Sequence, residues 1–139
     1  MNTLLGVAGV VALLAAFVWL ERKRERRKVE AAFTGRDPLS DEQFFERYFR
    51  TKGVRIEVAS EVRRILTEQL GQDLSRLQSS DDFTKNLKFL FEFDSLVDVE
   101  IVLALEEGFG IKITDEEAQA MRTVEDIVLV VHGKLHAAQ

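Results

Sequence analysis

The serine at position 95 is the side chain of this sequence best placed for covalent chemistry. Ser95 follows Asp94 and precedes the run LVDVEIVLALEEGFG, whose apolar spacing is that of a helix. A phosphate ester on a serine that starts a helix would meet free backbone amides and the positive end of the helix dipole. Asp and Ser are also common helix-capping residues. Taken alone, residues 94–96 favour the capping interpretation.

The helix after Ser95 carries two apolar stripes rather than one. At 100° per residue, one stripe suits a protein core, and the other lies on the opposite side with carboxylates along its border. An exposed apolar patch with a charged border is typical of a partner-docking surface. Asp98 does not fit this division, because its angle places it beside the core stripe. The core stripe is Val97, Ile101, Ala104 and Leu105, the second stripe is Leu96, Val99 and Leu103, and the border is Glu100, Glu106 and Glu107.

Other reactive side chains predict little. The absence of cysteine excludes disulfides, thiolate metal sites and a cysteine nucleophile, and two histidines (His132 and His136) are too few for a multi-histidine metal centre. A Ser-His-Asp triad could use Ser95, but no segment supplies an oxyanion loop. The acidic groups at 81–82 and 115–117 could hold a cation weakly, although capping and helix-dipole roles explain them better. We predict no catalytic residue, no metal site and no enzymatic activity.

The elements that would position Ser95 are helices. Ser40 and Thr114 have capping-box spacing and Thr123 resembles another cap. No segment shows the alternating pattern of a strand. The sequence predicts an all-α fold, a four-helix bundle with a short third helix, preceded by a linker helix and an N-terminal transmembrane helix. The expected helices after the anchor begin at Ser40 (the linker helix), Arg55, Asp94, Thr114 and Thr123. Gly71 closes the helix from Arg55, and Gly108 and Gly110 close the helix from Asp94.

The linker helix that begins at Ser40 carries four large rings, at Phe44, Phe45, Tyr48 and Phe49. These rings either pack on the following domain or face a partner or the membrane interface. We favour packing.

Residues 3–20 are uncharged and apolar. As a helix, they would span about 27 Å, close to the hydrocarbon core of a bilayer. Residues 21–30 hold six Lys/Arg against three Glu, and such a basic excess marks the cytoplasmic side and could bind anionic headgroups. We expect a single-pass protein of the cell inner membrane with its N-terminus outside and its C-terminal domain cytoplasmic. A cleaved signal peptide is the competing interpretation, but the segment lacks a basic start and an Ala-x-Ala cleavage site.

Differences in charge divide the chain into three predicted parts. We expect an anchor at 1–20, a basic juxtamembrane segment with the linker helix at 21–54, and the bundle domain at 55–139. Residues 51–139 hold ten basic and seventeen acidic side chains, a net charge of −7. Such a domain argues against a nucleic-acid partner, because phosphate binding needs a basic face.

From Asp94 to about Ile127 the sequence resembles the acyl carrier protein family, and the resemblance extends more loosely back to Val58. The motif Asp-Ser-Leu is short, but here it opens an acidic helix that is followed by a capped short helix. The other matching residues are Glu100, Ala104-Leu105-Glu106-Glu107, Phe109, Ile113, Asp115-Glu116-Glu117-Ala118 and Thr123-Val124.

The resemblance implies that Ser95, flanked by Asp94 and Leu96, carries a 4′-phosphopantetheine arm transferred from coenzyme A by a phosphopantetheinyl transferase. The thiol of the arm would hold an acyl group as a thioester. Acyl-loading and acyl-transferring enzymes would dock through basic patches, and charge matching would speed and orient their encounter. The implied docking residues are Leu96, Val99, Glu100, Leu103, Glu106 and Glu107.

Four features depart from the family pattern. Residues 87–93 (LKFLFEF) lengthen the loop before Asp94 by about four residues and are rich in phenylalanine, so their rings could close an acyl cavity or obstruct the transferase. Val97 stands where an acidic residue is common, and Thr114 where proline is common. Fusion to a transmembrane helix is also unusual.

The sequence thus predicts a membrane-anchored acyl carrier protein that serves cytoplasmic-face enzymes of fatty acid, lipid or membrane-linked biosynthesis. The alternative is an unmodified carrier-like adaptor that recruits partner proteins to the membrane. A third hypothesis is a hydrolase that uses Ser95.

Overall fold

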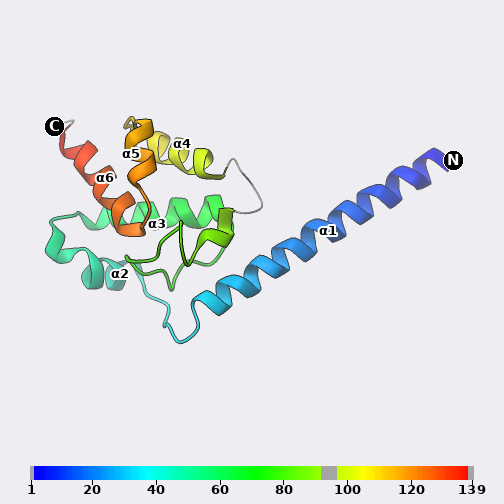
Figure 1. Cartoon of the computed structure of the whole chain (residues 1–139), viewed down its shortest axis with the longest axis horizontal. Helices are drawn as coiled ribbons and strands as arrows, with labels where there is room; N and C mark the ends of the chain where they lie inside the picture. The colour runs from blue at the N-terminus through cyan, green and yellow to red at the C-terminus, as the bar shows by residue number, and fades with distance from the viewer. Residues whose placement is uncertain (1, 92–96, 138–139) are drawn as a thin grey trace. The chain divides into compact units, whose positions relative to one another are not determined.

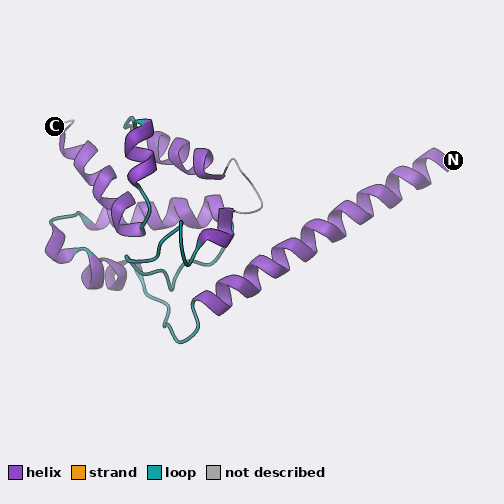
Figure 2. Ribbon diagram, in the orientation of Figure 1, coloured by secondary structure: helices purple, strands orange, loops and turns teal. Residues whose placement is uncertain are grey.

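Helices make up the regular structure of the described residues, which confirms the predicted all-α class (Figure 2). The computed structural model describes residues 2–91 and 97–137, where the one β-type pairing is an isolated bridge between Asp82 and Thr123. The chain forms two compact units, one ending at Thr34 and the other starting at Gly35. The helices are α1 (Asn2–Ala32), α2 (Asp41–Tyr48), η1 (Arg50–Lys52), α3 (Ile56–Leu70), η2 (Lys88–Phe91), α4 (Val97–Phe109), α5 (Asp115–Ala120) and α6 (Val124–Ala137).

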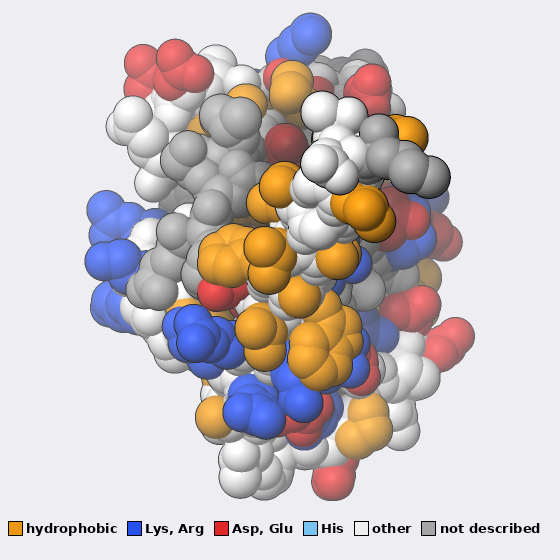
Figure 3. All heavy atoms as spheres, turned by 90° about the vertical axis from the view of Figure 1, so that its right-hand side faces the viewer, with side chains coloured by type: hydrophobic (Ala, Val, Ile, Leu, Met, Phe, Trp, Pro, Cys, Tyr) orange, Lys and Arg blue, Asp and Glu red, His pale blue; other side chains and the backbone are white. Residues whose placement is uncertain are grey.

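The first unit is the single helix α1. Its 31 residues span about 46 Å. An 18-residue window within it has a mean hydropathy of 2.4, so the helix is long and apolar enough to cross a membrane. Its large apolar side chains up to Leu20 are exposed, and Figure 3 shows them from the N-terminal end of the helix.

α1 continues beyond the predicted apolar span, which ends at Leu20. The basic segment forms further turns of the same helix, to Ala32. The hydroxyl of Thr34 donates to the carbonyl of Glu30 at 2.9 Å, so the last turn remains bonded to the helix. Gly35 then adopts a φ of 80°, a left-handed conformation that glycine tolerates and that ends helices.

In the second unit, α3 lies between α2 on one side and α4 and α6 on the other (Figure 1). The helical spacing of the sequence predicts one inward stripe for α3, which runs from Val58 to Gln69-Leu70. Its residues up to Leu66 are buried, whereas Gln69 and Leu70 are half-buried. α5 is the short third helix of the bundle. The buried side chains of the bundle include Val58, Val62, Ile65 and Leu66 of α3, Ile101 and Leu105 of α4, and Val124, Ile127, Val128 and Val131 of α6.

Local capping fixes the helix starts that the sequence predicted. Ser40 and Thr114 form reciprocal capping boxes, Ser40 with Gln43 and Thr114 with Glu117. The Thr123 hydroxyl accepts the backbone N–H three residues ahead at 3.0 Å. Each of these bonds satisfies an amide that the first helical turn leaves free.

α4 ends later than predicted. We expected the helix to run to about Glu107 and to be closed by Gly108 and Gly110. It runs to Phe109, and Gly110, whose φ is 65°, closes it. Gly108 instead sits at the packing surface between two helices, because a Cβ atom added there would lie 3.0 Å from Cδ1 of Ile65 in α3.

The aromatic side chains of α2 pack inward, as we favoured. Phe44 and Phe49 are fully buried, with ring centroids 5.5 Å apart, while Phe45 and Tyr48 are half-buried. The guanidinium of Arg63 lies 4.7 Å from the centre of the Phe44 ring.

The second compact unit begins at Gly35, whereas we predicted a boundary at Arg55 between linker and carrier domain. The segment 35–54 folds with the bundle. Where the functional domain begins stays a prediction.

Candidate functional site

The predicted attachment residues Asp94, Ser95 and Leu96 lie outside the described residues, which resume at Val97. The amino-acid sequence nevertheless limits which side chain could carry a phosphate ester. Ser95 is the only hydroxyl-bearing residue between positions 85 and 113. A phosphate ester in this stretch therefore has a single possible attachment oxygen.

The two faces of α4 differ in burial as their spacing predicted. Val97, Ile101 and Leu105 are buried on the core side, and Ala104, the fourth residue of that stripe, is half-buried. Val99 and Leu103 are 52% and 55% exposed, so two large apolar side chains face solvent on the other side. Exposed aliphatic side chains of this kind have no role in the core.

The three predicted docking glutamates have different surroundings. Glu100 and Glu107 are exposed. Glu106 is half-buried, and its Oε2 accepts the N–H of Ile113 at 2.9 Å. Glu106 therefore holds the loop that leads to α5. We refer below to the exposed residues Val99, Glu100, Leu103 and Glu107 as the α4 face.

The phenylalanine-rich insertion is folded inward over its described part. Leu87 and Leu90 are buried, and the rings of Phe83 and Phe91 meet edge to face with centroids 5.5 Å apart. Over residues 87–91 the two leucines are buried, while Phe89 and Phe91 are half-buried. That the rings close an acyl cavity or obstruct the transferase stays a prediction.

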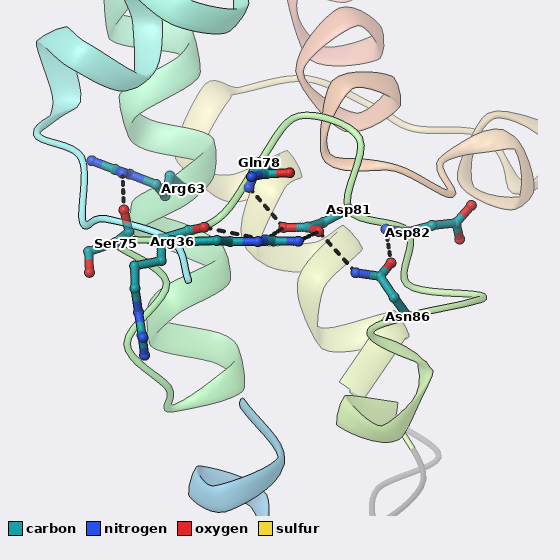
Figure 4. Close-up of polar contacts among 8 residues, drawn as sticks. Arg36, Arg63, Ser75, Gln78, Asp81, Asp82 and Asn86 are labelled. Carbon is teal, nitrogen blue, oxygen red and sulfur yellow. Dashed lines mark hydrogen bonds and ion pairs between the residues drawn. The ribbon is translucent and has the colours of Figure 1, made fainter. Parts of the chain in front are cut away.

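Asp81 is a buried carboxylate whose role the sequence did not reveal. Only 2% exposed, it accepts Nη1 and Nη2 of Arg36 at 2.8 and 3.0 Å, the N–H of Gln78 at 2.8 Å and Nδ2 of Asn86 at 2.9 Å (Figure 4). Each oxygen accepts two of these bonds, which matches the accepting capacity of a carboxylate. We considered residues 81–82 as a weak cation site or a cap, but Asp81 binds a partner 45 residues away.

Asp82 points elsewhere and organises a local turn. The hydroxyl and N–H of Thr84 donate to its Oδ1 at 2.6 and 2.7 Å, and its own N–H donates to Oδ1 of Asn86 at 2.8 Å. The hydrogen bond from the Thr84 side chain lowers the pKa of Asp82. Within residues 2–91 and 97–137 there is no group of three or more potential metal ligands.

Residues 60–131, just over half of the chain, match the family described as "Phosphopantetheine attachment site". This match defines the class of the second unit as a carrier domain.

Proteins similar to this chain in sequence or structure identify a narrower family within this class. The chain is 36% identical over 81 residues to an acyl carrier protein of Thermosynechococcus vestitus, which covers 58% of this chain and 95% of that protein. It is 39% identical over 72 residues to an acyl carrier protein of Helicobacter hepaticus, covering 52% and 90%. A crystal structure of an acyl carrier protein from Thermotoga maritima is 26% identical, with a TM-score of 0.49, and covers 60% of this chain and 92% of that one. On the family match and the two sequence relatives, the chain belongs to the acyl carrier protein family.

Membership makes the chain a carrier module and not an enzyme, and its cofactor is covalently attached 4′-phosphopantetheine. The described residues fit this cofactor. α4 is helical from Val97, its first described residue, so the positive end of its dipole favours a phosphodiester placed just before it.

Proposed function

We propose that this chain is a membrane-anchored acyl carrier protein in which Ser95 bears the 4′-phosphopantetheine arm. When bound, the cofactor supplies a thiol that holds an acyl group as a thioester, and this cysteine-free chain has no thiol of its own. The chain's own residues provide the attachment oxygen, a docking surface and a tether. Its partners are a phosphopantetheinyl transferase and the enzymes that load and unload the acyl group.

The main support for attachment at Ser95 is that this part of the sequence has no other hydroxyl-bearing side chain. The family match runs through this position, and no other serine, threonine or tyrosine lies between positions 85 and 113. Asp94 and Leu96 complete the Asp-Ser-Leu motif, and we include both in the proposed cofactor site.

The α4 face is proposed as the docking surface for partner enzymes. Val99 and Leu103 supply exposed apolar area, and Glu100 and Glu107 supply negative charge beside it. The half-buried Glu106 and Leu96 of the Asp-Ser-Leu motif complete the proposed set of docking residues. Basic patches on the partners would be steered to it by charge and held by apolar contact.

Membrane anchoring rests on α1. Its apolar part is exposed along its whole length, and six basic side chains follow within residues 21–28. This order of segments favours a span with the carrier domain on the cytoplasmic side, near anionic headgroups. Sedimentation with membranes after alkaline washing tests the anchor, and protease protection in oriented vesicles tests the orientation.

The deciding measurement is the intact mass of the full chain after co-expression with a permissive phosphopantetheinyl transferase. We expect the mass to rise by one phosphopantetheinyl group. Ser95→Ala should show no gain, while Ser80→Ala, which removes an exposed serine within the same family match, should gain fully. An unchanged mass of the natural chain would contradict the proposal and favour the unmodified docking adaptor.

A further inference from the structure

Two ion pairs bind the N-terminal segment of the carrier unit to the rest of the unit. Arg36 binds the carboxylate of Asp81 at two points, and Asp41 accepts Nη2 of Arg63 at 2.7 Å. The backbone between these pairs is also bonded, because the carbonyl of Leu39 accepts Nη1 of Arg63 at 2.9 Å. We call the pairs Arg36–Asp81 and Asp41–Arg63 the ionic clasp. The clasp fixes the chain to the unit from its second residue onward.

The chain between α1 and the clasp is very short. α1 ends at Ala32, Thr34 still bonds back to the helix, and Arg36 is already held by Asp81. Residues 33–35 are therefore the whole connector. Fully extended, three residues reach about 11 Å.

Chain lengths then set an upper limit on the height of the carrier unit above a membrane. The twelve residues of α1 after Leu20 rise at most about 18 Å. A unit of this size has a radius of gyration of about 13 Å and hence a diameter of roughly 35 Å. Adding the connector, every part of the unit stays within roughly 65 Å of the bilayer surface, whatever its orientation.

We propose that this short tether confines the carrier to a layer next to the bilayer and thereby selects its partners. This inference rests on the proposed function. The acyl-loading and acyl-transferring partners are membrane-bound enzymes whose active-site entrances lie within that layer. For such enzymes the tether raises the effective concentration of the acyl group, whereas soluble enzymes gain nothing from it.

The height is measured first, without reference to the cofactor. The natural chain has no cysteine, so the exposed Lys112 can be replaced by Lys112→Cys and labelled with a donor dye in the full chain. Energy transfer to acceptor dyes on the headgroups of phosphatidylcholine vesicles reports the height. A variant with thirty Gly/Ser residues inserted between Thr34 and Gly35 adds about 30 Å of mean reach, and the same thirty residues after Gln139 provide the matched control.

We expect the insertion at Gly35 to lower the energy transfer at least twofold and the C-terminal addition to leave it unchanged. Equal transfer from all three chains, or failure of the full chain to insert into vesicles, would overturn the inference.

Partner selection is measured with a phosphopantetheinyl transferase that is either soluble or fixed to the same vesicles. The vesicle-bound transferase should modify the natural tether severalfold faster than the lengthened one, and the soluble transferase should modify both equally. Equal rates with the bound enzyme would overturn the inference. No modification by either form contradicts the proposed function instead, and the energy-transfer measurement then decides the height.

Discussion

Arg36 and Asp81, 45 residues apart in the sequence, are joined by two parallel N–H···O bonds of 2.8 and 3.0 Å. The side chain of Asp81 is 2% exposed and that of Arg36 20%, so the pair is largely withdrawn from water. A guanidinium matches a carboxylate at two points, which an ammonium group cannot do. The pair therefore fixes both the position and the direction of the chain that enters the carrier unit.

Loss of Arg36 should destabilise the carrier unit. We expect Arg36→Ala to lower the free energy of unfolding by about 3 kcal/mol, because Asp81 would remain buried without its counter-charge. Arg36→Lys should recover part of this loss. Urea titration followed by circular dichroism measures the change. Arg50→Ala, which removes an exposed pair with Glu46, should cost less than about 0.5 kcal/mol, and equal losses for the two alanine variants would contradict the assignment.

The rings of α2 should contribute to stability in proportion to their burial. Phe44→Ala removes a fully buried ring that also lies under Arg63, and it should cost about 3–5 kcal/mol. The neighbouring ring of Phe45 is only half-buried, so Phe45→Ala should lower the free energy of unfolding by about 1 kcal/mol. The same titration compares them. Similar small losses would mean that α2 is dispensable to the fold.

Acid should weaken the carrier unit. A carboxyl group whose pKa is lower in the folded state stabilises the fold above its unfolded pKa of about 4, and this contribution is lost as the pH falls through the folded pKa. We therefore expect the Tm to fall below about pH 4. The groups with lowered pKa values are Glu61 bound by Arg64, Asp73 bound by Ser75, Asp82 bound by Thr84 and Glu117 bound by Lys134.

Thr84→Ala isolates one of these groups. Without the hydroxyl, the pKa of Asp82 is lowered less. The Tm of the variant should therefore lie below that of the natural chain at pH 6, and the difference should narrow as the pH falls to 2.5. Calorimetry at several pH values measures it. A difference that stays constant would show that Asp82 does not titrate as described.

Charge reversal on the α4 face should slow the encounter with partners but leave the fold intact. We expect Glu100→Lys with Glu107→Lys to lower kcat/KM of the phosphopantetheinyl transferase about tenfold, and added salt to reduce the difference. Glu57→Lys, a charge reversal at an exposed position of α3, is the control and should have little effect. An unchanged kcat/KM for the double variant would remove Glu100 and Glu107 from the docking surface.

The parts of the fold that the sequence predicted depend on interactions between residues close together in the chain. The starts of α2, α5 and α6 were predictable because Ser40, Thr114 and Thr123 bond to amides within three residues. The exposure of Val99 and Leu103 was predictable because helical spacing alone separates them from the buried stripe.

The parts that it missed depend on partners distant in the chain or on tertiary packing. Nothing near Asp81 in the sequence indicates that Arg36 binds it. Gly108 was predicted to close a helix, as glycine often does, but its close approach to Ile65 is visible only in three dimensions. The proposed attachment role of Ser95 came from a family resemblance, because in a sequence a helix-capping serine and a cofactor-bearing serine have the same local pattern.

Gly108 has no side chain, and this allows α4 to pack close to Ile65 of α3. A methyl group there would arrive 3.0 Å from Cδ1 of Ile65, so either that isoleucine must rotate or the helix must shift outward. Shortening Ile65 to valine would make room again. The absence of a side chain at Gly108 therefore allows α4 to lie close to α3 at this point, although the glycine itself is exposed, and the spacing of the two helices here depends on residues 65 and 108 together.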